Sequence, residues 1–125
     1  MPFDMRESWA VEVYLPKKLQ HLSELYNYLR SKLADRRAGV TQAVPIDGFS
    51  MYEVDGAFLG DRIYEERTLV IRILFPKDPH APPESLRQQL QELGDEIAQS
   101  VALTEEEIWI CHAPQTLTVF RPQSL

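Results

Sequence analysis

The sequence predicts a single α+β domain of the ferredoxin-like type, a βαββαβ sandwich with two helices on one face of a mainly antiparallel sheet. Two stretches carry apolar residues at helical spacing, and each lies between runs with strand-like alternation. In chain order the elements read strand, helix, strand, strand, helix, strand, which is the split βαβ arrangement of this fold. The 125 residues suit one domain over 1–125, with flexible ends expected at residues 1–7 and 121–125.

The first strand is predicted over Trp9–Leu15, where apolar side chains recur at every second residue. Pro16 ends this strand, because proline removes a backbone donor. The first helix is predicted over Lys17–Ala38, where apolar residues recur at steps of three and four. They form one stripe of Leu19, Leu22, Tyr26, Leu29 and Leu33. Gly39 is placed to close the helix in a left-handed conformation.

A second strand is predicted over Phe49–Val54 and a third over Arg67–Phe75. The third strand is apolar on nearly both faces, which is typical of a central strand. Between them, Asp55–Glu66 is predicted to form a long β-hairpin arm. Both Asp55-Gly56 and Gly60-Asp61 have turn-forming composition, so the tip and the register of the hairpin stay open.

A second helix is predicted from Glu84 onward, with an apolar stripe that runs from Leu86 to Val101. A fourth strand is predicted over Ile108–Cys111. After Pro114, Thr116–Phe120 is predicted as one more short strand, a possible extra edge of the sheet.

The sheet face that the helices leave open is the main candidate surface. Its side chains are too apolar and aromatic for a plain solvated face, and large exposed apolar patches are uncommon on monomers. We therefore expect a ligand or another protein surface to cover it. The candidate residues on this face are Glu12, Tyr14, Tyr52, Val70, Arg72, Leu74 and Trp109. The hairpin arm is a second candidate interface, with the apolar residues Phe58, Leu59, Ile63 and Tyr64.

Glu12 and Arg72 are expected to face each other on the two central strands, on the open face. Opposite charges across a strand pair stabilise a sheet by about 0.2–1 kcal/mol when they are exposed. One interpretation is a structural ion pair. The other is a polar anchor inside an apolar pocket for a small ligand.

Composition argues against several classes of partner. The chain has 13 basic and 19 acidic residues, a net charge of −6, whereas nucleic acids and anionic lipids attract positive surfaces. Residues 67–74 also lack the aromatic and glycine pattern of RNA-recognition domains. The apolar runs are too short to span a membrane, and residues 1–8 lack the apolar core of a secretory signal. A cytoplasmic location is expected.

No motif predicts a catalytic residue, a cofactor or a metal site. Cys111 and His112 are adjacent, so on a strand they point to opposite faces, and Cys111 is expected to be a small buried hydrophobe. The three histidines have no ligand spacing. The run Glu105–Glu107 is expected to be a solvated acidic turn.

The segments Gly48-Phe49 and Asp55-Gly56, followed by Glu66 and Thr68–Ile71, resemble a pattern in short uncharacterised bacterial proteins of ferredoxin-like fold. The resemblance covers most of the chain and implies that fold, with no activity to carry over.

These observations favour a non-enzymatic homodimer that associates through its open sheet face and serves as a binding, accessory or regulatory module. The hairpin arm would clasp the partner subunit. Two alternatives stay open. One is a cofactor-independent enzyme or binder of a small apolar ligand, of the dimeric α+β barrel type, with its pocket at the open face. The other is a subunit of a larger complex that docks another protein through the hairpin arm.

Overall fold

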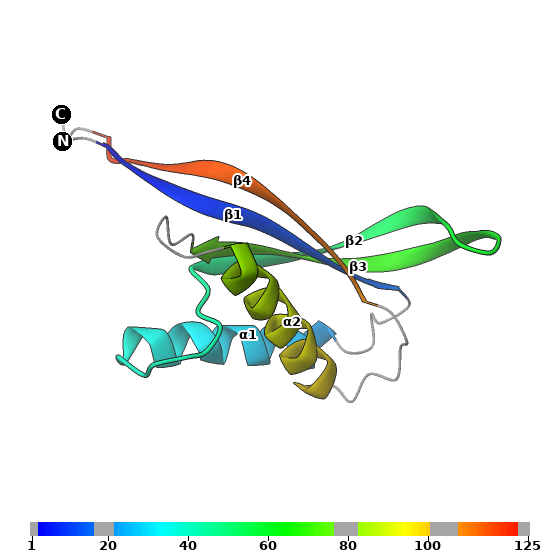
Figure 1. The fold of residues 1–125 in the computed structure, drawn as a ribbon, viewed down its shortest axis with the longest axis horizontal. Helices are drawn as coiled ribbons and strands as arrows, with labels where there is room; N and C mark the ends of the chain where they lie inside the picture. Colours follow the sequence, from blue (N-terminus) through cyan, green and yellow to red (C-terminus); the bar gives the residue numbers. More distant parts are fainter. Residues whose placement is uncertain (1–2, 17–21, 77–82, 101–107, 123–125) are drawn as a thin grey trace.

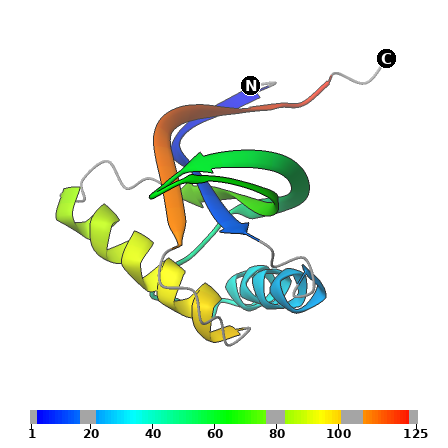
Figure 2. The same ribbon diagram turned by 90° about the vertical axis from the view of Figure 1, so that its right-hand side faces the viewer.

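The structure is a computed structural model that describes residues 3–16, 22–76, 83–100 and 108–122. Its elements are β1 (Phe3–Pro16), α1 (Leu22–Arg37), β2 (Gly48–Leu59), β3 (Ile63–Pro76), α2 (Pro83–Ser100) and β4 (Trp109–Phe120). The strands form one antiparallel sheet in the order β2-β3-β1-β4, and both helices cover the same face of it (Figures 1 and 2). The predicted ferredoxin-like βαββαβ sandwich is confirmed.

The core lies between the helices and the sheet. Alternate residues of the central strands β1 and β3 point toward the helices, as the period-two pattern predicts. The buried apolar residues are Val11, Val13, Leu15, Leu69, Ile71, Ile73 and Phe75 from the sheet, Leu25, Leu29, Leu93 and Ile97 from the helices, and Val44 and Ile46 from the α1–β2 connection.

The end of α1 follows the prediction, but its buried stripe is shifted. Gly39 has a φ of 84°, and the Val40 N–H donates to the Asp35 carbonyl at 2.9 Å. Tyr26, which we expected in the apolar stripe, is 49% exposed, whereas Leu25 and Lys32 are buried. Helical spacing alone allows either rotation of the helix, and the packing partner decides between them. The predicted first residues of this helix, 17–21, lie outside the described residues.

The strands β1 and β4 are longer than expected, and their additional residues pair with each other. We expected a flexible end over residues 1–7 and two separate C-terminal strands, but Phe3–Glu7 pair with residues 116–120, and β4 runs without a break through Pro114. The expected extra edge strand is therefore the second half of β4. Because β4 is an edge strand, the missing N–H of Pro114 can face away from β1 without breaking the ladder.

The hairpin arm is formed, and the structure decides its tip. Leu59 pairs with Ile63, and the Gly60 N–H donates to the Arg62 carbonyl at 2.9 Å. Asp55 and Gly56, the other candidate turn, lie within the paired part of β2. The proline-rich connector over 77–82, His21, His80 and the acidic run 105–107 lie outside the described residues.

Candidate functional site

The open face of the sheet carries three rows of residues that run across all four strands. The strand register defines an aromatic row of Tyr52, Val70, Tyr14 and Trp109. Next to it lies a polar row of Ser50, Arg72, Glu12 and Cys111. The third row is small and apolar, and consists of Gly48, Leu74, Ala10 and Ala113. All seven residues predicted for this face therefore lie on it, in adjacent rows.

The hairpin arm covers part of the aromatic row. Its strands curve over the sheet (Figure 2). The centroid of the Phe58 ring lies 6.5 Å from that of Tyr14 and 5.5 Å from that of Trp109, and both contacts are edge to face. Val70 lies between Tyr52 and Tyr14 in this row and is only 2% exposed. The chain itself thus supplies some of the cover that we expected from a partner.

The two ends of the aromatic row stay open. Tyr52 on β2 is 40% exposed and Trp109 on β4 is 44% exposed. In the polar row, Arg72 and Cys111 are exposed as well. The open part of this surface therefore includes two aromatic side chains, one guanidinium group and one thiol group.

The arm itself exposes two apolar residues at its tip. Leu59 and Ile63 are cross-strand partners, and both are largely exposed. Phe58 and Tyr64 are half-buried, and the Tyr64 ring lies 4.7 Å from the Arg62 guanidinium. Of the four residues predicted for this interface, only Leu59 and Ile63 face solvent.

The hydrogen bonds and ion pairs of the polar row differ from the expectation. Glu12 and Arg72 are directly opposite in the strand register, but in the described part of the chain no ion pair joins them. The Glu12 carboxylate instead accepts a hydrogen bond from the Tyr14 hydroxyl at 2.7 Å. Residues two apart on a strand share a face, so this hydroxyl competes with the guanidinium for the carboxylate.

The same hydrogen bond changes the chemistry of Tyr14. The bond to Glu12, together with partial burial and the negative charge of the Glu12 carboxylate, raises the pKa of Tyr14 to about 12. Tyr14 is therefore a hydrogen-bond donor at neutral pH and is poorly suited to act as a base.

Cys111 does not behave as the buried hydrophobe that we expected, because it is exposed. It lies on the edge strand, at the end of the polar row that the arm leaves open. His112 follows it on the opposite face, where its ring meets the Trp9 ring at 5.5 Å. The two side chains do not form a thiol–imidazole pair, as strand geometry predicts.

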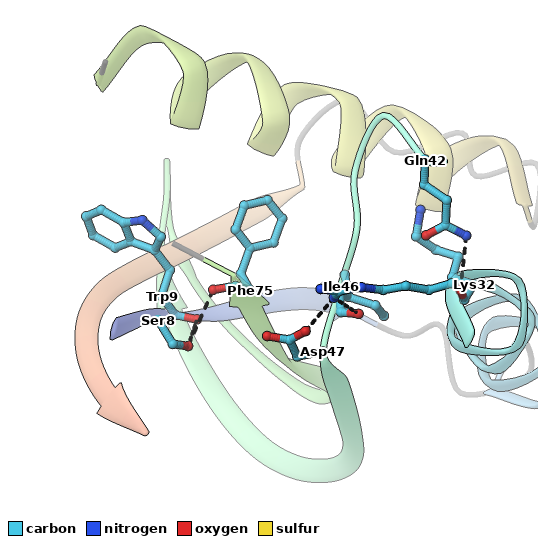
Figure 3. A network of polar contacts seen from close by, with 8 residues as sticks. Ser8, Trp9, Lys32, Gln42, Ile46, Asp47 and Phe75 are labelled. Carbon is cyan, nitrogen blue, oxygen red and sulfur yellow. Dashed lines mark hydrogen bonds and ion pairs between the residues drawn. The ribbon is translucent and has the colours of Figure 1, made fainter. Parts of the chain in front are cut away.

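A polar cluster in the helix layer was not anticipated. Lys32 is 5% exposed and forms an ion pair with Glu96 of α2 at 3.0 Å. Its backbone carbonyl accepts a hydrogen bond from Gln42 at 3.0 Å (Figure 3). Burial and the nearby Glu96 carboxylate raise the pKa of Tyr28 above its ordinary value. A lysine in the last turns of a helix usually faces water, so nothing in the sequence marks this one as buried.

A second network ties the start of β2 to α1. The Arg36 guanidinium donates to the Ile46 carbonyl at 2.7 Å and pairs with the Asp47 carboxylate. Between the central strands, the Ser8 hydroxyl donates to the Phe75 carbonyl at 3.4 Å (Figure 3). A cavity of about 560 Å³ lies beside this network. Its charged lining is balanced, with Arg6 and Arg36 against Glu7 and Asp47, so it favours neither sign of ligand charge.

Within the described ranges, no three histidine, cysteine or acidic side chains come together as a metal site. In the same ranges, no helix is both long and apolar enough to cross a membrane.

Comparisons with known proteins place the fold and nothing finer. No protein-family model matches the chain, and no curated protein matches its sequence. The periplasmic divalent cation tolerance protein CutA from Archaeoglobus fulgidus matches in structure with a TM-score of 0.54 and 11% identity, over 87% of this chain and 83% of that one. A Bacillus cereus protein related to NIF3 matches with a TM-score of 0.51 and 16% identity, over 92% of this chain but 27% of its own. At these identities the likeness shows a shared ferredoxin-like fold.

Proposed function

We propose that this chain is a non-enzymatic binding or regulatory module of the cytoplasm that forms a homodimer through its open sheet face. The observation that carries the proposal is the exposure of Tyr52 and Trp109 at the two ends of the aromatic row. Aromatic side chains are enriched at protein interfaces, where they bury large apolar areas.

A face-to-face dimer would use the aromatic row and the polar row of the surface. It would bury Tyr52 and Trp109, and it would bring the exposed Arg72 of one copy close to the Glu12 carboxylate of the other. The ion pair that is absent within one chain would then form between two. A stable interface of this kind buries about 1,200 Å² or more in total.

Solution mass tests the proposal. Light scattering over a dilution series is expected to give a mass near twice 14.5 kDa that falls at low concentration. Tyr52→Ser is expected to weaken the dimer. Tyr26→Ser is the matched control, because Tyr26 is similarly exposed, at 49%, but lies on α1. A wild-type monomer at every concentration, or equal effects of the two variants, would contradict the proposal.

The small-ligand alternative rests on Arg72. Its guanidinium is exposed beside an aromatic row, and it has no ion-pair or hydrogen-bond partner among the described residues. An apolar anion would find an aromatic wall and a positive anchor there.

The aromatic sulfonate dye anilinonaphthalene sulfonate is a suitable probe of that alternative. If Arg72→Leu abolishes dye binding and leaves the mass unchanged, the pocket is favoured. If Arg72→Leu instead dissociates the dimer, the guanidinium belongs to the interface.

The exposed arm tip supports the third role, as a subunit that docks another protein. Leu59→Ser and Ile63→Ser together would then raise the solubility of the isolated chain without changing the dimer mass. An arm that clasps a second copy would instead make the same double variant dissociate.

A further inference from the structure

We infer that the outer edge of β4 pairs with β4 of a second copy, antiparallel, over residues 115–120. This interface is separate from the open sheet face of the proposed function, and it uses backbone groups rather than the aromatic row.

The sheet order leaves this edge available. β4 is the outermost strand and, in the described part of the chain, pairs only with β1. The backbone groups on the outer side of an edge strand form a ready template for another strand. Proteins usually block such edges with charged residues, prolines or bulges.

β4 lacks the usual charge protection. Its twelve residues include no aspartate, glutamate, lysine or arginine, although the chain as a whole carries a net charge of −6. The opposite edge strand, β2, carries Glu53 and Asp55, so two β2 strands would place like charges near each other. β4 is thus the edge on which a strand can pair with its own copy without charge repulsion.

Pro114 limits the pairing to the second half of β4, because proline cannot donate to a ladder. The remaining segment, Gln115–Phe120, consists mostly of threonine and large apolar residues, which favour extended structure.

The structure around this segment shows why pairing with a third strand would stabilise it. Among the described residues, β3 pairs with β1 as far as Ser8–Pro76, and beyond that pair residues 3–7 and 116–120 form a two-stranded ribbon. Figure 1 shows this ribbon projecting away from the helices, and Met5 and Phe120 on it are mostly exposed. A two-stranded ribbon is marginally stable in water. Pairing with a second copy would make four strands, in the order β1-β4-β4-β1.

The symmetry of this pairing has a consequence for the open face. Two identical antiparallel strands in one sheet are related by a two-fold axis perpendicular to the sheet. The helices of both copies then lie on one side and both open faces on the other. Edge pairing therefore joins the two open faces into a larger surface and does not cover them.

Charge substitution at the edge tests the inference. Thr116 and Thr118 are exposed and share a face of β4. If the two-fold axis lies between the two copies of Leu117, Thr116 of one copy lies opposite Thr118 of the other. If the axis lies between the two copies of Thr118, these two threonines lie opposite each other. In either register, Thr116→Lys with Thr118→Lys is expected to weaken association about tenfold or more. Thr116→Gln with Thr118→Gln is the neutral control and is expected to associate as the wild type does.

Mixing two variants of opposite charge gives the decisive test. The double lysine variant and the matching Thr116→Glu, Thr118→Glu variant should each lose the edge pairing alone, so that each has at most the mass of the open-face dimer, and should recover the edge pairing when they are mixed. Hydrogen exchange of the wild type adds a readout that needs no variant: amides in 115–120 should become protected as concentration rises.

The inference is overturned if the double lysine variant keeps the wild-type mass, or if amides 115–120 exchange at the same rate at all concentrations. A dimer that Tyr52→Ser dissociates and the lysines do not would overturn the edge pairing and leave the proposed function standing. The reverse result would support edge pairing and overturn the face-to-face dimer.

Discussion

At the scale of single residues, Tyr14 shows how a strand position controls chemistry. It sits two residues from Glu12 on one face, and the resulting hydrogen bond of 2.7 Å stabilises the neutral phenol. The folded state therefore holds the Tyr14 proton to a higher pH than the unfolded chain, whose tyrosines titrate near 10.

The raised pKa of Tyr14 gives a pH dependence with a definite sign. Between about pH 10 and 12 the folded state binds more protons than the unfolded state, so the contribution of Tyr14 to stability is complete below pH 10 and is lost as pH rises. Tyr14→Phe should remove that part of the alkaline decline, and Glu12→Gln should lower the pKa of Tyr14 toward 10. Urea unfolding across this range measures the first effect, and ultraviolet titration the second. Parallel stability curves for wild type and Tyr14→Phe would contradict the assignment.

Lys32 makes a second residue-scale prediction. Lys32→Met should lower the free energy of unfolding by about 1–3 kcal/mol, because it leaves the half-exposed Glu96 carboxylate without its buried partner. Adding Glu96→Gln should recover part of the loss. Arg30→Met, on an exposed site of the same helix, should change stability by less than about 0.5 kcal/mol. Equal urea midpoints for the Lys32 and Arg30 variants would show that the pair contributes nothing.

At the scale of elements, the hairpin arm has a glycine beside the ring that covers the aromatic row. A Cβ atom at Gly56 would lie 2.8 Å from the Phe58 ring, closer than van der Waals contact allows. The ring that covers the aromatic row and the glycine that makes room for it are therefore one structural unit.

Gly56→Ala should destabilise the protein by about 1–3 kcal/mol through this clash. The cost should be smaller in a Phe58→Leu background, where the shorter side chain leaves room for the methyl group. A double-mutant cycle by thermal unfolding measures the coupling. Additive effects would mean that the two residues do not constrain each other.

At the scale of the whole molecule, net charge opposes the association of two copies and apolar surface favours it. Each copy carries a charge of −6, so two copies repel at long range, while burial of apolar and aromatic surface favours association.

Dimerisation should therefore strengthen as salt is raised, since salt screens the repulsion and leaves the apolar contact intact. Sedimentation at low and at high sodium chloride measures the dissociation constant directly. A dimer that weakens with salt would show that ion pairs such as Arg72 with Glu12 dominate the interface.

Most of the fold could be predicted because periodicity is a local property of the chain. The alternation in Trp9–Leu15 and the stripe in the second helix each record which side of an element is buried, and the order of elements then leaves few topologies. The same alternation predicts which residues lie on the open face, because β1 and β3 are the central neighbours in this fold.

Only the tertiary structure decided features that depend on what lies opposite. Phe3–Glu7 become a strand because 116–120 lie beside them, Lys32 is buried because Glu96 meets it, and Cys111 is exposed because it lies on the edge strand beyond the cover of the arm. Glu12 binds Tyr14 rather than Arg72 for a similar reason, since two partners within reach compete through distance and angle. The sequence by itself determined the order of the helices and central strands and the sheet face that their residues occupy, since these follow from local period. Contacts between distant segments were decided by three-dimensional packing, which local patterns do not encode.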